Sequence, residues 1–435
     1  MLINGSPPWR AAAAAILIVL AGCSASDNDA QSNRPVDPDA ALFAPTPDAD
    51  DFYRAPEGLQ GAPGTVIKFR EITYQPAGAV LPNSAWQLQY LTTDVQGRVI
   101  AATATVVKPV GPSAYGDPVL LSFQHAYDSL GAQCTPSHTA TGSSANTTNM
   151  AETLEYLPAL QTLGWTLLIP DYEGPDHAFG AGRLSGQATL DAIRAALGFE
   201  PLGLSASTPV GLWGYSGGAY ATTWAAAMQA QSAPEINLVG VVAGGTPVNL
   251  LEVIPGAENT DSFSLLLGLL FGVARAYPEF LPADLLNEEG RRALAALRDS
   301  CEGKPTDGSA APNGQLADYV NADAPYNTAG FLSVGPRLDL LRSEMHPASD
   351  VFLYHEIDDE LVPIAGADAL ADRWCQAGTP LSYYRSTAAS AGGATPVGTH
   401  TSGAALGTPN AIAYLDSRFS GLGAPATPVG TTRCN

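Results

Sequence analysis

The sequence predicts an α/β fold, in which a mostly parallel sheet carries helices on both faces and a helical insertion follows late in the chain. Short apolar runs that suit buried strands alternate with segments of helical spacing through the first half of the sequence. The 435 residues, of which 46% are hydrophobic and 14% charged, suffice for one large domain with an insertion. Between residues 246 and 338 strand signals stop and helical spacing prevails, which predicts the insertion.

The expected strands fall into two groups. Alternating apolar and polar residues predict half-buried strands, with an antiparallel hairpin near the start, at residues 66–70, 86–92 and 99–108. Continuous apolar runs, typical of strands covered on both faces, occur at residues 117–123, 164–169, 210–213, 236–243, 351–355 and 381–384. Apolar residues three or four positions apart predict helices at residues 149–163, 184–197, 219–228, 265–276, 282–297, 338–343 and 409–419. Since helices separate the buried strands, parallel pairing is expected.

The N-terminus predicts export. Arg10 precedes an apolar run, and small residues follow before Cys23, as in a secretory signal peptide over residues 1–22. The ending Leu-Ala-Gly-Cys resembles the bacterial lipobox, which implies cleavage before Cys23 and attachment of a lipid to its sulfur. An ordinary signal peptide cut nearby is the alternative. Residues 23–60 are then a lipid-anchored flexible tether, since Ser, Asp, Asn and Pro dominate their first half. The protein is expected to be a membrane-anchored lipoprotein of the cell envelope, or secreted.

Charge and cysteine content exclude some partners. The formal net charge of −22 argues against nucleic-acid binding, which requires a basic face. Five cysteines are present, and if Cys23 carries lipid the other four can form disulfides in an oxidising compartment. Those four are Cys134, Cys301, Cys375 and Cys434, and the sequence leaves all three pairings open. No two of them have the Cys-x-x-Cys spacing of a zinc site, so we expect no metal.

A serine-containing turn at residues 214–218 is the strongest functional signal. The apolar run 210–213 leads into Gly-Tyr-Ser-Gly-Gly, and a helix-forming segment follows at once. Strand, tight turn and helix around Gly-x-Ser-x-Gly are typical of the nucleophile elbow of the α/β-hydrolase fold. The glycines are needed because the strained turn brings neighbouring backbone close, and the helix N-terminus favours the negative charge of acyl transfer. A Gly/Ser turn without chemistry is the alternative interpretation.

A serine nucleophile needs a histidine base, which comes last in the chain order of this fold. Three histidines follow Ser216, namely His346, His355 and His400. His400 is the expected base because it lies between the last strand and the last helix, where a loop can bring it over the serine. His355 lies within an expected strand and suits the core equally well.

The orienting carboxylate and the oxyanion donors have candidates too. Asp359 is the expected carboxylate and Asp358 the runner-up, because both follow the buried strand at 351–355; a plain acidic turn is the alternative. One oxyanion donor should be the N–H of Gly217, directly after the nucleophile. The other should come from the loop at residues 124–129, which follows an earlier strand.

These motifs together resemble the secretory lipase family over about residues 64–419. Beside the elbow, the resemblance rests on residues 124–129, 170–175, 179–180, 359–363 and 400. It implies a triad of Ser216, Asp359 and His400, with oxyanion donors at Asp128 and Gly217. It also implies the disulfides Cys134–Cys301 and Cys375–Cys434. The domain plan is an α/β-hydrolase core over residues 61–245 and 339–435, interrupted by a helical lid over residues 246–338.

The sequence therefore predicts a serine hydrolase of carboxylic esters, a triacylglycerol lipase acting through an acyl-enzyme, because family members hydrolyse acylglycerols and simpler esters. Such hydrolysis needs no metal or organic cofactor. The expected partners are a small-molecule ester or acylglycerol and, through the lipid anchor, a membrane. A carboxylesterase or acyltransferase for short or polar acyl groups is the first alternative. A non-catalytic, lipid-binding surface lipoprotein is the second.

Overall fold

The computed structural model describes residues 42–387, 398–421 and 426–435. The expected signal peptide, the lipid attachment site Cys23 and the tether up to residue 41 lie outside the described residues. None of the helices in the described part is long and apolar enough to cross a membrane.

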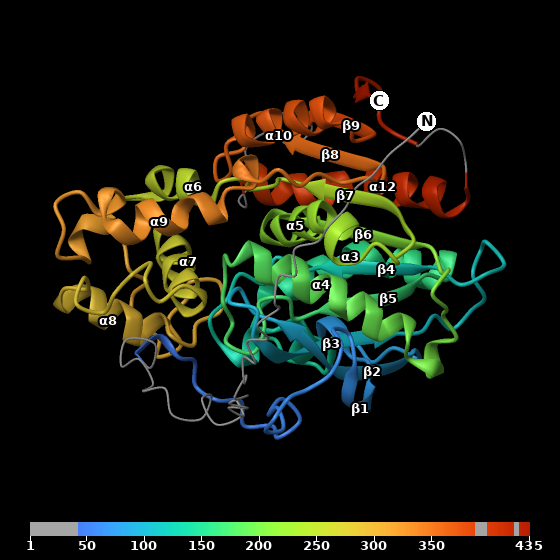
Figure 1. The fold of residues 1–435 in the computed structure, drawn as a ribbon, viewed down its shortest axis with the longest axis horizontal. Helices are drawn as coiled ribbons and strands as arrows, with labels where there is room; N and C mark the ends of the chain where they lie inside the picture. Colours follow the sequence, from blue (N-terminus) through green and yellow to red (C-terminus); the bar gives the residue numbers. More distant parts are fainter. Residues whose placement is uncertain (1–41, 388–397, 422–425) are drawn as a thin grey trace, which may run out of the picture. The chain divides into compact units, whose positions relative to one another are not determined.

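The described strands form one ten-stranded sheet in the order β1-β2-β3-β5-β4-β6-β7-β8-β9-β10 (Figure 1). Its parallel centre consists of β4 (Leu120–Gln124), β5 (Thr166–Pro170), β6 (Val210–Tyr215), β7 (Leu238–Gly244), β8 (Val351–Glu356) and β9 (Leu381–Ser386). The antiparallel strands at its two ends are β1 (Val66–Thr73), β2 (Ser84–Thr93), β3 (Val99–Val107) and β10 (Thr432–Cys434). The mostly parallel sheet predicted from the apolar runs is confirmed.

Helices cover both faces of the sheet. One face carries α4 (Gly182–Leu197), α5 (Ser216–Ser232) and α10 (Ile364–Ala377), and the other carries α3 (Thr147–Pro158) and α12 (Gly398–Phe419). Neighbouring residues of β6 show this division. Leu212 packs into the core of α4 and α5, whereas Trp213 packs into the aromatic core that includes Tyr414 of α12. Because both faces are covered, the central strands are apolar at successive positions.

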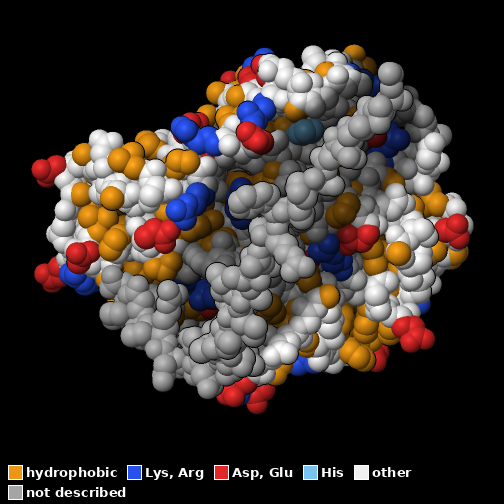
Figure 2. Space-filling view, viewed as in Figure 1, with side chains coloured by type: hydrophobic (Ala, Val, Ile, Leu, Met, Phe, Trp, Pro, Cys, Tyr) orange, Lys and Arg blue, Asp and Glu red, His pale blue; other side chains and the backbone are white. Residues whose placement is uncertain are grey.

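Four helices of the insertion gather beside the end of the sheet to which the parallel strands point (Figure 1), and we call them the cap helices. They are α6 (Leu250–Ala257), α7 (Phe263–Ala276), α8 (Glu288–Leu297) and α9 (Ala329–Leu338). Apolar and charged side chains are interspersed over them on the face shown in Figure 2. The apolar helix α7 is buried along most of its length, so it forms the core of the cap.

Three helix boundaries differ from those expected. The helix expected from residue 282 begins at Glu288, because the Asn287 side chain accepts a hydrogen bond from the N–H of Gly290 at 2.9 Å and caps it. Residues 338–343 form only a short 3₁₀ turn, Leu340–Arg342, after α9. The last helix begins at Gly398 and continues through Pro409, where the sequence suggested its start.

The first described residues are packed, which contradicts the expectation of a flexible tether over residues 42–60. Phe43 is 1% exposed, and its ring centroid lies 6.0 Å from that of Phe271 in α7. Nε of Arg275 donates to the carbonyl oxygen of Phe43 at 2.7 Å, and the N–H of Thr46 donates to Asp299 at 2.8 Å. Composition alone was misleading because a few aromatic side chains, among them Phe43 and Tyr53, anchor an otherwise polar segment.

Candidate active site

Ser216 stands on a strained turn between β6 and α5. Its φ of +51° lies in the left-handed region, which residues with a side chain seldom adopt. A Cβ on Gly214 would lie 2.4 Å from the carbonyl oxygen of Gly218, and one on Gly218 would lie 2.0 Å from that of Gln124. Only glycine fits at these two positions. The turn thus has the geometry of the expected elbow, with Ser216 at the first position of α5.

His400 lies in the first turn of α12, within hydrogen-bonding distance of the serine. Its Nε2 is 2.8 Å from Oγ of Ser216, and its Nδ1 is 2.7 Å from Oδ2 of Asp359. Because a carboxylate can only accept, we assign the proton to Nδ1, which leaves Nε2 free to accept from the hydroxyl. The imidazole therefore bridges the hydroxyl and the carboxylate, as a general base requires.

Asp359 is held in the turn after β8. Its side chain is 0% exposed, and its Oδ1 accepts the N–H groups of Leu361 at 3.0 Å and Val362 at 2.7 Å. Burial opposes its charge, but hydrogen bonds from His355 and His400 outweigh burial and hold the pKa of Asp359 below its ordinary value. The runner-up, Asp358, is exposed, whereas Asp359 lies beside the histidine.

Two contacts that the sequence did not reveal fix the backbone of His400. Oε2 of Glu360 accepts the N–H groups of Thr399 at 2.9 Å and of His400 at 3.0 Å, and so caps α12. The hydroxyl of Tyr215 donates to the carbonyl oxygen of His400 at 2.7 Å. The acidic run after β8 was a signal for Glu360, but its partner could not be recognised while α12 was expected to begin at residue 409.

The expected oxyanion donors lie next to each other beside the serine. Asp128, Ser216 and Gly217 line one pocket, and a Cβ on Gly217 would fall 1.8 Å from Oδ1 of Asp128. This close approach explains why a glycine follows the nucleophile. Burial, followed by the charge of Glu302, raises the pKa of Asp128 to about 7.

His125 lies in the loop of residues 124–129 but does not belong to the hydrogen-bonded chain of the site. Neither of its ring nitrogens has a hydrogen-bond partner in the described part of the protein, and the ring packs edge-on against Phe123 at 5.0 Å. Burial lowers the pKa of His125 to about 3. Its carbonyl oxygen accepts from the hydroxyl of Tyr172 at 2.6 Å, so the residue helps to shape the loop.

Two cavities meet at Ser216. The narrower one is apolar and runs beneath the cap helices, with walls that include Phe179, Tyr220, Leu250, Val253, Leu266 and Leu269. The wider one, of about 870 Å³, lies between α3 and α12, and Ser216 and His400 form part of its wall. Its lining includes Glu152, Glu155 and Glu302. The serine therefore faces apolar space on one side and a larger, more polar space on the other.

The acidic wall of the wider cavity was not predicted from the sequence. Glu152 is 4% exposed, and its Oε2 accepts the N–H of Ala126 at 2.8 Å, which anchors the loop that leads to Asp128. Burial raises the pKa of Glu155 to about 8 and that of Glu152 well above its ordinary value. Burial therefore favours the protonated, uncharged form of both carboxyls. The described residues contain no group of three or more His, Cys, Asp or Glu side chains placed to hold a metal ion.

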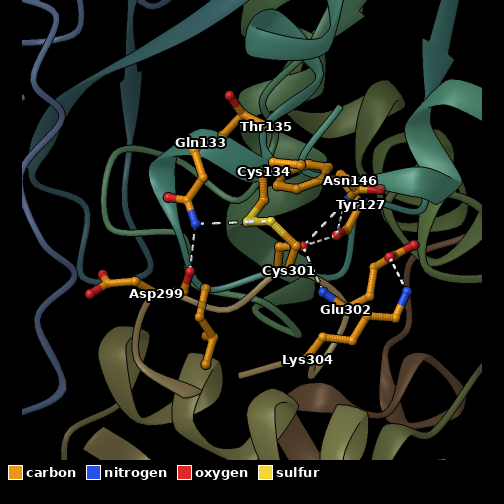
Figure 3. Close-up of a disulfide and its surroundings, with 12 residues drawn as sticks. Tyr127, Gln133, Cys134, Thr135, Asn146, Asp299, Cys301, Glu302 and Lys304 are labelled. Atoms are coloured by element: carbon orange, nitrogen blue, oxygen red, sulfur yellow. Dashed lines mark hydrogen bonds and ion pairs between the residues drawn. A yellow bond between two sulfur atoms is a disulfide. The ribbon is translucent and has the colours of Figure 1, made fainter. Parts of the chain in front are cut away.

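The Cys134–Cys301 disulfide joins the loop of Asp128 to the cap (Figure 3). Around it, the N–H of Glu302 donates to Oγ of Ser129 at 3.2 Å, and Nε2 of Gln133 donates to the carbonyl oxygen of Asp299 at 2.6 Å. A second disulfide, Cys375–Cys434, joins α10 to β10. Both pairs coincide with those that the family resemblance implied.

Comparison with known proteins finds a matching family model, similar sequences and a similar structure. The sequence model of the secretory lipases matches residues 139–426. A secreted triacylglycerol lipase of Malassezia furfur is 32% identical over 395 residues, which cover 88% of this chain and 81% of the relative. A Candida albicans lipase, Lipase 6, is 31% identical over 419 residues, covering 91% and 87%. The crystal structure of Candida antarctica lipase A in its closed state superposes with a TM-score of 0.75 at 27% identity, over 87% of each chain.

Proposed function

The chain belongs to the secretory lipase family, and from this premise we propose that Ser216, Asp359 and His400 form the catalytic triad of a triacylglycerol lipase. The protein is a serine hydrolase of carboxylic esters. The observation that carries the proposal is the continuous hydrogen-bonded chain from Oγ of Ser216 through the imidazole of His400 to Oδ2 of Asp359. This hydrogen-bonded series favours a catalytic site over a non-catalytic lipid-binding lipoprotein, since lipid binding alone does not require such an arrangement.

The proposed reaction begins with acylation. Oγ of Ser216 attacks the ester carbonyl carbon while Nε2 of His400 takes the hydroxyl proton, and Asp359 stabilises the resulting imidazolium. The negative charge on the former carbonyl oxygen is stabilised by the backbone N–H groups of Asp128 and Gly217. When the ester bond breaks, His400 gives its proton to the departing alcohol.

Deacylation repeats these steps with water. His400 removes a proton from a water molecule, whose oxygen attacks the acyl carbon. As the bond from the acyl carbon to Oγ breaks, His400 returns this proton to Oγ, which restores the Ser216 hydroxyl and releases the carboxylic acid. The carboxylate of Asp359 stays ionised throughout, as its lowered pKa requires.

The two cavities suggest how an ester is oriented. A fatty acyl chain suits the apolar pocket under the cap helices, and the departing alcohol suits the wider, more polar cavity. Since α6 and α7 supply much of the apolar wall, we propose residues 246–338 as the lid. The narrowness of this pocket favours a second candidate, a carboxylesterase for short acyl groups. A series of p-nitrophenyl esters of increasing chain length separates the two, because a lipase retains activity on long chains.

The triad is tested by Ser216→Ala, with Ser207→Ala, an exposed serine, as the matched control. We expect Ser216→Ala to lower kcat by about 10³-fold or more and to abolish labelling by a fluorophosphonate probe, while the control changes neither. Nearly intact activity in Ser216→Ala would remove the proposed mechanism.

The named relatives include secreted lipases, which supports export of this protein. Anchoring through a lipid on Cys23 extends this proposal to a residue outside the described part of the chain. Cells fed a labelled fatty acid should incorporate the label into the wild-type protein but not into Cys23→Ser. Equal labelling of the two proteins would exclude the anchor.

A further inference from the structure

Helix α3 departs from the pattern of an ordinary surface helix at three positions, although its Tyr156 packs in the core. Its two glutamates, Glu152 and Glu155, are 4% and 8% exposed, whereas Leu154 between them is 63% exposed. A soluble helix normally places its leucines against the core and its charged residues in water. One exposed leucine is common on a soluble protein, so its neighbours decide whether it belongs to a binding surface.

Helix α12 lines the same cavity as α3. The stretch of sequence from residue 398 to 415 contains no Asp, Glu, Lys or Arg, although the whole chain carries a net charge of −22. Leu406 of this helix is 49% exposed, and Ala405 beside it is exposed as well. Together with Ala151 and Leu154 of α3 they border the cavity of about 870 Å³ that reaches Ser216. We call these four residues, Ala151, Leu154, Ala405 and Leu406, the rim surface.

We propose that the rim surface docks the enzyme on the surface of aggregated ester, such as an oil droplet, with the mouth of the wider cavity facing the droplet. The proposal rests on the proposed function, because it assigns the rim surface to delivery of an insoluble substrate to Ser216. Two leucine side chains can enter an acyl layer, and the small side chains of the two alanines let the helices approach it. No charge on these four residues has to leave water.

The position and size of the rim surface favour this occupant over a protein partner. A stable protein interface buries about 800 Å² on each side and is built around large aromatic or arginine anchors, which four aliphatic residues do not supply. A lipid surface requires no matching shape, only apolar side chains that it can bury. Docking here would also place the substrate reservoir directly at the entrance to the catalytic cavity.

Other exposed apolar side chains provide the control. Val110 is 72% exposed, but it lies in the connection from β3 to the amino end of β4, at the sheet edge opposite Ser216. Scattered exposed apolar residues are normal on soluble proteins. Among the residues that the structure describes, only those of the rim surface combine such exposure with the mouth of the catalytic cavity.

The test compares the wild type, the double variant Leu154→Gln/Leu406→Gln and the control Val110→Gln, all carrying Cys23→Ser so that an N-terminal lipid cannot contribute. Rates are measured on dissolved p-nitrophenyl acetate and on triolein emulsions of graded interfacial area. We expect the double variant to lose much less activity on the dissolved ester than on the emulsion, because the two leucines border the mouth of the cavity. On the emulsion it should need about 10- to 100-fold more interfacial area for half-maximal rate, as expected from partial burial of two leucines. The control should match the wild type on both substrates.

Equal losses on both substrates, or no loss on either, would overturn the docking proposal. Flotation of the proteins with triolein droplets in a Ser216→Ala background measures docking without hydrolysis. There, unchanged flotation of the double variant would overturn the proposal, and reduced flotation would support it even if triolein were not a substrate. Failure of the wild type to hydrolyse either ester would instead refute the proposed function.

Discussion

Nε2 of His355 lies 3.4 Å from Oδ2 of Asp359, the oxygen that also lies 2.7 Å from Nδ1 of His400. The same Nε2 is 2.9 Å from the carbonyl oxygen of Val362, which can only accept, so we assign the proton to Nε2. His355 thus clamps the turn that carries the triad carboxylate. Its side chain is 0% exposed, and the strand β8 that holds it fixes its position.

We expect His355→Leu to lower kcat by about 10- to 100-fold with little change in KM, because Asp359 loses its support while the substrate pockets remain. His355→Gln should retain most of the activity, since its amide N–H can replace the Nε2–H donor. Steady-state kinetics on a soluble p-nitrophenyl ester provide the measurement. A fully active His355→Leu enzyme would show that the second histidine is only core packing.

The two disulfides should differ in their effect on activity. The backbone of Cys301 pairs with that of Ser129 in an isolated antiparallel β-bridge, and the N–H of Leu130 donates to the carbonyl oxygen of Ser300 at 3.0 Å. The Cys134–Cys301 disulfide therefore holds the cap against the loop of Asp128. Replacing both cysteines by serine should cost about 2–4 kcal/mol of unfolding free energy and should also lower kcat.

The matched control is replacement of Cys375 and Cys434 by serine. The two cysteines of that disulfide are 59 residues apart in sequence, whereas Cys134 and Cys301 are 167 apart. The disulfide joins α10 to the edge strand β10, far along the sheet from β6. It should lower thermal stability with kcat unchanged. Thermal unfolding and kcat measured on both pairs decide the point, and a larger loss of kcat in the control pair would contradict it.

The sheet could be predicted because β4 to β9 are covered on both faces, and such strands appear in the sequence as unbroken apolar runs. The three-residue strand β10 has no such pattern. Helix α12 was shortened in the prediction because Pro409 resembled a helix start, whereas the helix continues through it with one backbone donor fewer. Local signals do not show when tertiary packing sustains a helix across a proline.

Ser216 was recognisable because the elbow is a local motif, and His400 and Asp359 were recognisable through their order after it. The contacts of Glu360 and Tyr215 with the start of α12 join segments that are distant in sequence, so no spacing could reveal them. The burial of Glu152 and Glu155 in α3 was hidden for a similar reason. Helical spacing shows that a helix forms, but only packing shows which of its faces is buried.

Val253 of α6 offers a test of the apolar pocket as the acyl site. It is 7% exposed and lines the pocket next to Ser216, so Val253→Phe should fill space that a long acyl chain needs. We expect kcat/KM for dodecanoyl and longer esters to fall by about 10-fold or more, with acetate hydrolysis nearly unchanged.

Leu332→Phe is the control for this change, because Leu332 belongs to cap helix α9 but is 63% exposed. Chain-length profiles of p-nitrophenyl esters for the three proteins give the comparison. A uniform loss across all chain lengths in Val253→Phe would mean that acyl chains bind elsewhere.

The buried carboxyls predict how stability depends on pH. Burial raises the pKa of Glu155 from 4.5 to about 8, and burial with the charge of Glu302 raises that of Asp128 from 3.8 to about 7. Between these values the folded state holds protons that the unfolded state has released, so stability falls as pH rises. His125 and His177 act oppositely below 6.5, because burial lowers the pKa of each to about 3. As pH rises from 6.5 to about 8 the histidine contribution fades, and the effect of the carboxyls dominates.

We expect the melting temperature to decrease over this window and the decrease to be smaller in Glu155→Gln, which cannot ionise. It should not vanish, because Asp128 and Glu152 still titrate from raised pKa values. Glu57→Gln, at an exposed glutamate, should follow the wild-type curve. Thermal unfolding by circular dichroism at half-unit pH steps measures the three slopes. Identical slopes in wild type and Glu155→Gln would show that Glu155 is already ionised in the folded protein, and hence that the wall of the wider cavity carries charge at neutral pH.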